Sequence, residues 1–378
     1  MKYIFLIAAF NALFFAILLF QKKPRALHDN ILILWLLYLG LFIGVYSFYS
    51  HELFTHFKLL SISFISLFLL HGVFLYFYIS ALVSSKNIFN KTNLIHFAPF
   101  VLFNCYLLVI SFFPNISEMT RLDYAQVNIS PPFLFIFFLI ATILSGPLYF
   151  AVSIRLFKKL DINIFNNFSS SEEINLVWLR KLVYIFGIIW TILIVITVIH
   201  HVFNLFSMAF CTDGLFLSMS VFVILIGYFG LKQKVIFSGD SENEQVIVEE
   251  TKVKYASSRL TEAEANQFAD KLNNFMVSEK PFLNPNLTLQ QLASELGIST
   301  HYLSQVINKK FNINFFDYIN QFRVEEFKVK INNPKFENYS FLGVAFDSGF
   351  NSKSAFNRIF KKFTNLTPSQ YKAAVTKH

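Results

Sequence analysis

The sequence predicts an all-α protein in which seven membrane-spanning helices form a bundle and a charged domain of shorter helices follows. The 378 residues are 55% hydrophobic and only 15% charged, whereas a soluble domain carries about 25% charged residues. The charge is also uneven, because residues 1–237 hold 15 Lys+Arg and 8 Asp+Glu while residues 238–378 hold 17 and 15. Two units of different class are therefore expected.

Seven apolar stretches are long enough to cross a bilayer, which takes about 20 residues. They are expected at 3–20, 31–49, 59–83, 95–113, 133–156, 182–206 and 215–237. No Asp or Glu lies within them, which argues against an aspartyl intramembrane protease and against carboxylate proton relays. The motifs of zinc proteases, P-loop proteins and kinases are missing as well. We expect no enzyme, no metal site and no cofactor.

The distribution of Lys and Arg among the short loops predicts the orientation, because basic loops stay in the cytoplasm. The loops after spans one, three and five and the exit from the last span hold 12 of these residues. The other side holds three, Lys2, Lys58 and Arg121. We expect a multi-pass protein of the bacterial cytoplasmic (inner) membrane, with its N-terminus outside, its C-terminal domain in the cytoplasm and the lipid bilayer as a partner.

Three histidines within the spans, His71, His200 and His201, are candidate sensor residues. Ionisable residues inside a membrane are candidates for function, and histidine titrates near neutral pH. The alternative is that these side chains bond neighbouring helices or lie at the membrane interface.

A polar and acidic linker is expected at 238–260, because Ser238 opens a run of Gly, Asp, Ser, Glu and Asn residues. Thr261 and Glu264 then form the pattern of a capping box, which marks the start of a helix. Residues 261–378 are expected to form one domain, in which short helices alternate with Gly, Asn and Pro breaks.

This domain contains a degenerate repeat. The first copy is Ala293, Gly297, Ser299, Leu303, Ile307 and Lys309, and the second is Ala345, Gly349, Ser352, Phe356, Phe360 and Lys362. The small residue allows close helix crossing, the glycine turns the chain, the serine caps the next helix and the apolar residues pack it back. This pattern predicts two helix-turn-helix units, whose second helices enter the DNA major groove. One helix at 315 to about 332 would hold the two units at a fixed distance, and recognition helices about 34 Å apart can enter successive major grooves.

Residues 288–371 closely resemble the DNA-binding domain of AraC-type (AraC/XylS family) transcription regulators. The residues that carry the resemblance best are 349–362 and 367–371, and Asn365 stands where the family usually has Gly. Asn tolerates the left-handed conformation that ends a helix there. The resemblance implies transcription regulation through double-stranded DNA, and the N-terminal part looks like the multi-span regions joined to such domains in some bacterial regulators.

Helix geometry nominates the residues that contact DNA. Those expected to face outward and reach bases are Thr300, His301, Ser304 and Gln305 in the first unit, and Lys353, Ser354, Asn357 and Arg358 in the second. Gln305 suits adenine, and Arg358 suits guanine. The residues expected to position the domain on phosphates are Lys309, Lys310, Lys361 and Lys362. Since residues 261–378 carry a net charge of only +4, we expect moderate, salt-dependent electrostatic affinity.

The sequence therefore predicts a membrane-embedded one-component transcription regulator, in which a transmembrane sensor for an unknown ligand controls a sequence-specific DNA-binding domain. A second copy of the chain is a further candidate partner, which would make the protein a homodimer. Two alternatives are a membrane transporter or enzyme with a regulatory helical tail, and a helical domain that serves as a protein-interaction module.

Overall fold

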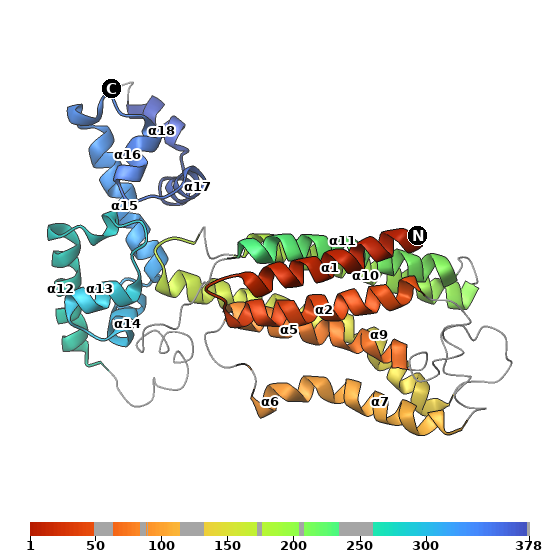
Figure 1. The fold of residues 1–378 in the computed structure, drawn as a ribbon. Helices are drawn as coiled ribbons and strands as arrows, with labels where there is room; N and C mark the ends of the chain where they lie inside the picture. Colours follow the sequence, from red (N-terminus) through yellow and green to blue (C-terminus); the bar gives the residue numbers. More distant parts are fainter. Residues whose placement is uncertain are drawn as a thin grey trace. The chain divides into compact units, whose positions relative to one another are not determined.

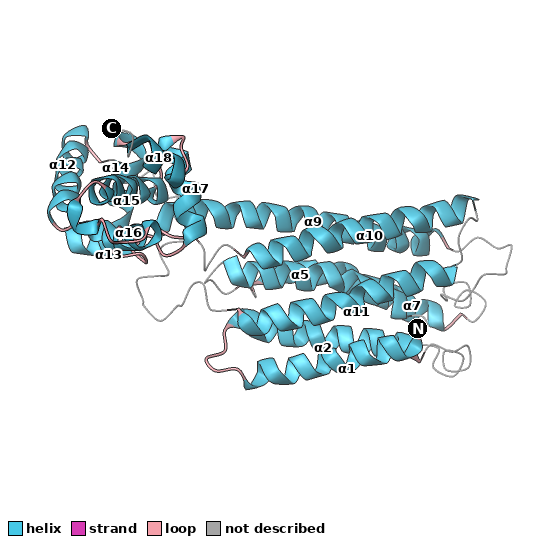
Figure 2. Cartoon of the chain, turned by 90° about the horizontal axis from the view of Figure 1, so that it is seen from above, coloured by secondary structure: helices cyan, strands magenta, loops and turns pink. Residues whose placement is uncertain are grey.

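The computed structural model describes residues 1–48, 63–83, 88, 90–113, 132–171, 176–203, 208–233 and 260–375. Most of these residues lie in helices, and the one β-contact among them is an isolated bridge between Phe168 and Thr288 (Figures 1 and 2). The all-α prediction is confirmed. The chain divides into two compact units, Met1–Phe157 with Val177–Gln245 and Lys158–Leu176 with Val246–His378. The expected linker lies outside the described residues apart from Leu260.

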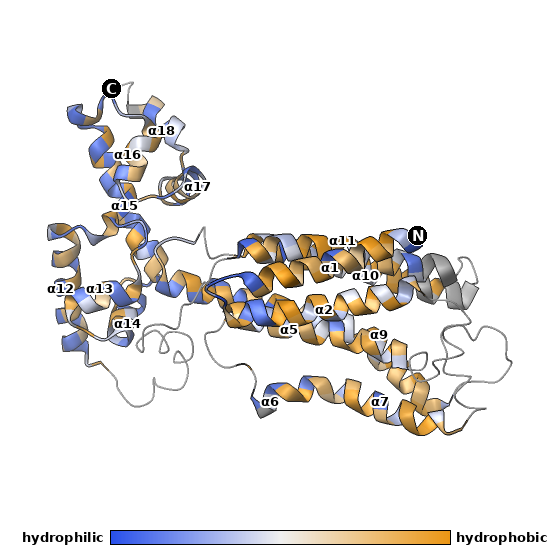
Figure 3. Ribbon diagram, viewed as in Figure 1, coloured by the Kyte–Doolittle hydropathy of each residue, from blue (hydrophilic) through white to orange (hydrophobic). Residues whose placement is uncertain are grey.

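The first unit contains long apolar helices, which stand out by hydropathy in Figure 3. The elements are α1 (Lys2–Gln21), α2 (Leu27–Ser47), η1 (Phe64–Leu67), α5 (Phe68–Val83), α6 (Lys91–Leu94), η2 (Ile95–Phe97), α7 (Ala98–Ser111), α9 (Phe133–Asn167, of which the part from Lys158 onward belongs to the second unit), α10 (Val177–Phe203) and α11 (Met208–Lys232). Within the described ranges they provide seven helical segments that are long and apolar enough to cross a membrane, in agreement with the predicted number.

Several of these helices extend past the expected spans. Helix α2 begins at Leu27, because Asp29 accepts a hydrogen bond from the Ala26 amide at 2.9 Å. The Asp29 carboxylate is fully buried and pairs with Lys22 Nζ at 2.8 Å. Helix α9 continues beyond the expected end at residue 156 as far as Asn167. Hydropathy locates the apolar part of a helix but not the polar turns that prolong it.

Close packing of α1 on α2 depends on small side chains. Helix α1 buries Ala8, Ala9, Ala12 and Ala16, and a Cβ on Gly40 of α2 would lie only 3.2 Å from Ala12 Cβ. Small residues let helices approach closely where lipid removes the hydrophobic driving force.

The second unit contains the shorter helices. They are α12 (Glu262–Ser278), η6 (Pro281–Leu283), α13 (Leu289–Leu296), α14 (Thr300–Lys310), α15 (Phe315–Ile331), η7 (Pro334–Phe336), α16 (Phe341–Asp347), α17 (Lys353–Thr364) and α18 (Pro368–Val375). Helices α13 and α14 form the first helix-turn-helix unit, and α16 and α17 form the second. Helix α15 joins the two units, as the sequence predicts.

The turns of both units follow the predicted chemistry. Gly297 and Gly349 have φ of 66° and 94°, a conformation that costs glycine little. Ser299 and Ser352 cap α14 and α17 by accepting hydrogen bonds from backbone amides at 3.2 and 3.0 Å. Asn365 ends α17 with φ of 60°, so the left-handed helix end expected there is confirmed.

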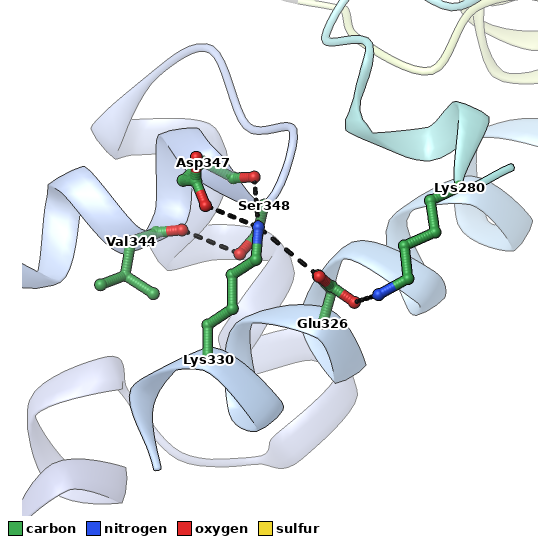
Figure 4. Close-up of polar contacts among 6 residues, drawn as sticks. All are labelled: Lys280, Glu326, Lys330, Val344, Asp347 and Ser348. Atoms are coloured by element: carbon green, nitrogen blue, oxygen red, sulfur yellow. Dashed lines mark hydrogen bonds and ion pairs between the residues drawn. The ribbon is translucent and has the colours of Figure 1, made fainter. Parts of the chain in front are cut away.

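Ion pairs fix α15 to the elements on either side of it (Figure 4). Glu326 accepts from Lys280 Nζ at 2.9 Å, and Lys330 Nζ lies 3.5 Å from the other oxygen of Glu326. Lys330 also donates to the side chain and the carbonyl of Asp347, at 2.6 and 2.7 Å, at the end of α16. Single surface ion pairs contribute little to stability, but this series connects η6, α15 and α16 and so fixes their orientation.

Candidate nucleic-acid interface

The recognition helix of the second unit, α17, presents the face that the sequence predicts. Ala355, Phe356, Ile359 and Phe360 are buried in the core of this unit. The opposite face is exposed and consists of Lys353, Ser354, Asn357 and Arg358. The Arg358 guanidinium lies over the Phe316 ring, with its carbon 6.0 Å from the ring centroid.

The recognition helix of the first unit, α14, is more covered. Leu303, Val306 and Ile307 are buried as expected, whereas Thr300, His301 and Ser304 are half-buried.

The expectation that Gln305 faces outward is wrong, because only 3% of this residue is exposed. Its Nε2 lies 2.6 Å from His301 Nε2, and its Oε1 has no hydrogen-bond partner among the described residues. Helical periodicity shows only that Gln305 points away from the core of its own unit. It does not show which surfaces of α14 are covered by other parts of the chain.

The four lysines predicted to contact phosphates lie at the C-terminal ends of α14 and α17 and reach the surface. Two of them are paired with carboxylates: Lys310 Nζ lies 3.5 Å from Glu262, and Lys362 Nζ lies 2.6 Å from Asp317. Lys309 and Lys361 have no ion pair within the described part of the chain, so they are the better candidates for phosphate contacts.

Sequence reasoning missed Arg323, a buried arginine of α15 that is only 2% exposed. Burial lowers its pKa to about 9, so it stays protonated at neutral pH. A buried charge is costly unless it is fully hydrogen-bonded, and Arg323 makes five hydrogen bonds. The acceptors are the carbonyls of Phe282, Asn284 and Ser169, the Asn320 side chain and the Ser169 hydroxyl.

Among the sensor candidates, His71 is buried in the first unit, where its Nε2 lies 3.2 Å from the Tyr38 hydroxyl. It borders a cavity of about 90 Å³, whose lining includes Trp35, Tyr149 and Trp190. The side chains of His200 and His201 lie outside the described residues.

Comparison with known proteins assigns the C-terminal part of the chain. Residues 292–374 match a protein family described as "Helix-turn-helix domain". An uncharacterized HTH-type transcriptional regulator of Staphylococcus aureus (strain COL) is 28% identical over 103 residues, which are 27% of this chain and 13% of that protein. The Msm operon regulatory protein of Streptococcus mutans serotype c is 27% identical over 90 residues, which are 24% of this chain and 31% of that protein.

The chain therefore covers only a small part of these relatives, and the matches concern its second unit. No solved structure matches the chain. The matched residues are those that form the two helix-turn-helix units, so the C-terminal part of the chain is an AraC-type helix-turn-helix domain, similar to those of HTH-type transcriptional regulators.

Proposed function

We propose that the protein is a one-component transcription regulator embedded in the bacterial cytoplasmic membrane, which binds double-stranded DNA in a sequence-specific way under the control of its transmembrane part. The observation that carries this proposal is the presence in one chain of seven apolar helices and two helix-turn-helix units. The excess of Lys and Arg in alternate loops favours a cytoplasmic position for the DNA-binding domain.

The exposed face of α17 is the better candidate for base readout. Arg358 can donate two hydrogen bonds to guanine, while Lys353, Ser354 and Asn357 lie beside it on the same exposed face. In α14 the candidates at the surface are Thr300, His301 and Ser304. Lys309 and Lys361 would contact phosphates, which position the domain without reading the sequence.

The cavity beside His71 is our candidate for the sensor site. Aromatic and aliphatic side chains line most of it, so its ligand would be small and largely apolar. Trp35, which is 3% exposed, has an indole N–H without a hydrogen-bond partner among the described residues. A ligand with one hydrogen-bond acceptor would satisfy this donor.

Chromatin immunoprecipitation of the tagged full-length protein tests DNA binding. We expect discrete sites that are lost in Arg358→Ala and kept in the control Lys335→Ala, which removes an exposed charge outside both recognition helices. Sites that persist in Arg358→Ala would contradict the assigned reading face. An absence of sites for the unaltered protein under every growth condition would contradict the proposed function.

The sensor assignment is tested by Trp35→Phe, which keeps the ring but removes the N–H. A reporter driven from the sites found above should lose its response to growth conditions. The control Trp178→Phe removes an N–H that is already bonded to Gln233 Oε1 at 2.9 Å. An unchanged response in Trp35→Phe would exclude this donor from ligand binding.

A further inference from the structure

The end of α9 and the residues after it pack into the second unit. We call residues 165–171 the docking segment; it belongs to the Lys158–Leu176 stretch of that unit. By hydropathy these residues form only a loop between the fifth and sixth spans. They nevertheless contact both helix-turn-helix units and the helix α15 that joins them.

The docking segment contacts the first helix-turn-helix unit through its backbone. Phe168 forms an isolated antiparallel bridge with Thr288, the residue that caps α13. The Ser169 amide donates to the Leu287 carbonyl at 3.1 Å. The segment is therefore held at the start of the first unit.

The contact with α15 is a buried polar cluster. The Ser169 carbonyl accepts from Arg323 Nη1 at 2.9 Å and from Asn320 Nδ2 at 3.0 Å, and the Ser169 hydroxyl accepts from Arg323 Nη2 at 2.9 Å. Ser169 is 1% exposed and Asn320 is fully buried. The same guanidinium donates to Phe282 and Asn284, so Arg323 connects the docking segment to the loop before α13.

The docking segment also reaches the second helix-turn-helix unit. Asn351, which precedes the cap of α17, donates from Nδ2 to the Ser170 hydroxyl at 2.9 Å. The Phe165 ring meets the Phe316 ring edge-on, with 5.2 Å between centroids. The base-reading candidate Arg358 lies over that same Phe316 ring.

We propose that the docking segment is an autoinhibitory contact, which holds the two helix-turn-helix units in one fixed relation and must leave before both can bind DNA. This inference rests on the proposed DNA-binding function. Reading two successive grooves requires the two recognition helices to take the relative position that one turn of DNA dictates. The docking segment bonds to both units, so it fixes their relation, and its Phe165 packs on the Phe316 ring over which Arg358 lies.

Helix α9 supplies a route from the signal to this contact, because one continuous helix contains both ends (Figure 2). Gly146, Pro147, Tyr149 and Phe150 of α9 line the cavity described above. Phe165 lies about 24 Å further along the helix than Tyr149, at ~1.5 Å per residue. Pro147 lies inside the helix and removes one of its hydrogen bonds, which is a common origin of bending. A ligand that changes the bend at Pro147 would displace the docking segment.

A disulfide tests the docking independently of DNA. Ser170→Cys and Asn351→Cys are introduced into the full-length protein after Cys105 and Cys211 have been changed to alanine, and a protease site is placed within 241–256. In native membranes we expect an oxidant to form a disulfide between the two cysteines. The two fragments that the protease produces should then migrate together until a reductant separates them. The control pair Ile162→Cys with Asn351→Cys should stay separate, since Ile162 is 60% exposed on α9. A Ser170–Asn351 pair that does not join overturns the docking.

The same protein then tests inhibition, with fluorescent double-stranded genomic fragments as the probe. The oxidised pair should bind at least about tenfold more weakly than the reduced pair, as expected when the two units are locked in a relation that cannot adjust to DNA. The Ser170→Cys single variant should not respond to oxidation. Equal binding in both redox states of a fully joined protein overturns the inhibitory role. Efficient joining without DNA binding in either state overturns the proposed function and, with it, the inhibition.

A second test of the inhibition uses a substitution that introduces no disulfide. Phe165→Ala removes the ring that packs on Phe316, and we expect higher occupancy of the chromatin sites without the signal. Ile162→Ala, an exposed position on the same helix, should leave the occupancy unchanged. Unchanged or lower occupancy in Phe165→Ala, with a normal protein level, would overturn the proposal.

Discussion

The two helix-turn-helix units have the same pattern of residues but present different surfaces. In the second unit, α17 exposes Lys353, Asn357 and Arg358, whereas in the first unit α14 buries Gln305, the counterpart of Arg358. Their turns differ as well. A Cβ on Gly297 would meet no atom within 4 Å, but one on Gly349 would clash with the Phe282 carbonyl and lie 3.0 Å from Arg323 Nε. A repeat in sequence therefore conserves the fold of each unit while its surroundings decide what each unit can do.

The largest expected difference between the units comes from their turn glycines. Gly349→Ala combines a positive φ with a clash against backbone, so we expect it to destabilise the domain by roughly 3 kcal/mol or more. Gly297→Ala meets only the left-handed strain, about 1 kcal/mol. Pulse proteolysis of the full-length protein in urea measures both. Equal losses would show that the two turns are packed alike.

Base reading should differ by a smaller amount. We expect Arg358→Ala to weaken binding to the chromatin sites by about 1–3 kcal/mol, the value of one good base contact. Gln305→Ala should change DNA binding little, because Gln305 is buried and cannot reach a base.

Anisotropy with labelled fragments measures both variants. A large effect of Gln305→Ala would mean that α14 rearranges to expose this side chain when DNA binds.

These differences also show which features the sequence could reveal. The seven spans, the caps at Ser299 and Ser352 and the exposed face of α17 follow from local rules, because each depends on a few neighbouring residues and one helical period. The burial of Arg323 could also be predicted locally, because this residue lies four positions from both Ile319 and Phe327 on the inward face of α15. A lone arginine at such a position predicts a buried hydrogen-bonding centre.

The burial of Gln305 and the position of the docking segment could not be predicted in this way. Ser169 binds largely through its own amide and carbonyl, and its partners come from sequence positions more than a hundred residues away. Backbone groups are the same at every position, so no residue pattern marks such a contact. Hydropathy ended the fifth span at residue 156 and gave no reason for α9 to continue to Asn167.

The two helix-turn-helix units should resemble each other in their phosphate contacts, unlike in their base contacts. The logarithm of the DNA-binding constant falls linearly with the logarithm of the salt concentration, and removing one phosphate contact makes this slope less steep by about 0.9. We expect this change for Lys309→Ala and Lys361→Ala. Lys310→Ala and Lys362→Ala should lower it less, because carboxylates already hold these two ammonium groups. Affinity measured from about 50 to 200 mM salt gives the slopes. If Lys310→Ala changed the slope as much as Lys309→Ala, and Lys362→Ala as much as Lys361→Ala, the two ion pairs would have to open when DNA binds.

The smallest predicted difference concerns the helix caps and pH. Helix α12, which packs on α14, begins with a capping box in which Glu264 accepts from the Thr261 hydroxyl and amide at 2.6 and 2.9 Å. These hydrogen bonds lower the pKa of Glu264. Helix α18 of the second half uses Gln370 in the same position, and its oxygen accepts from the Thr367 amide at 2.8 Å. Only the first of these caps can titrate.

Because the folded pKa of Glu264 lies below its unfolded value, its contribution is complete above the unfolded pKa and is lost as pH falls through the folded pKa. Hydrogen exchange between about pH 6 and pH 3, corrected for intrinsic rates, should show the first turn of α12 fraying on acidification while α18 keeps its protection. Glu264→Gln should remove this difference, since an amide accepts the same bonds without titrating. If both helices frayed together, acid would be acting on the whole domain and not on a cap that only the first half possesses.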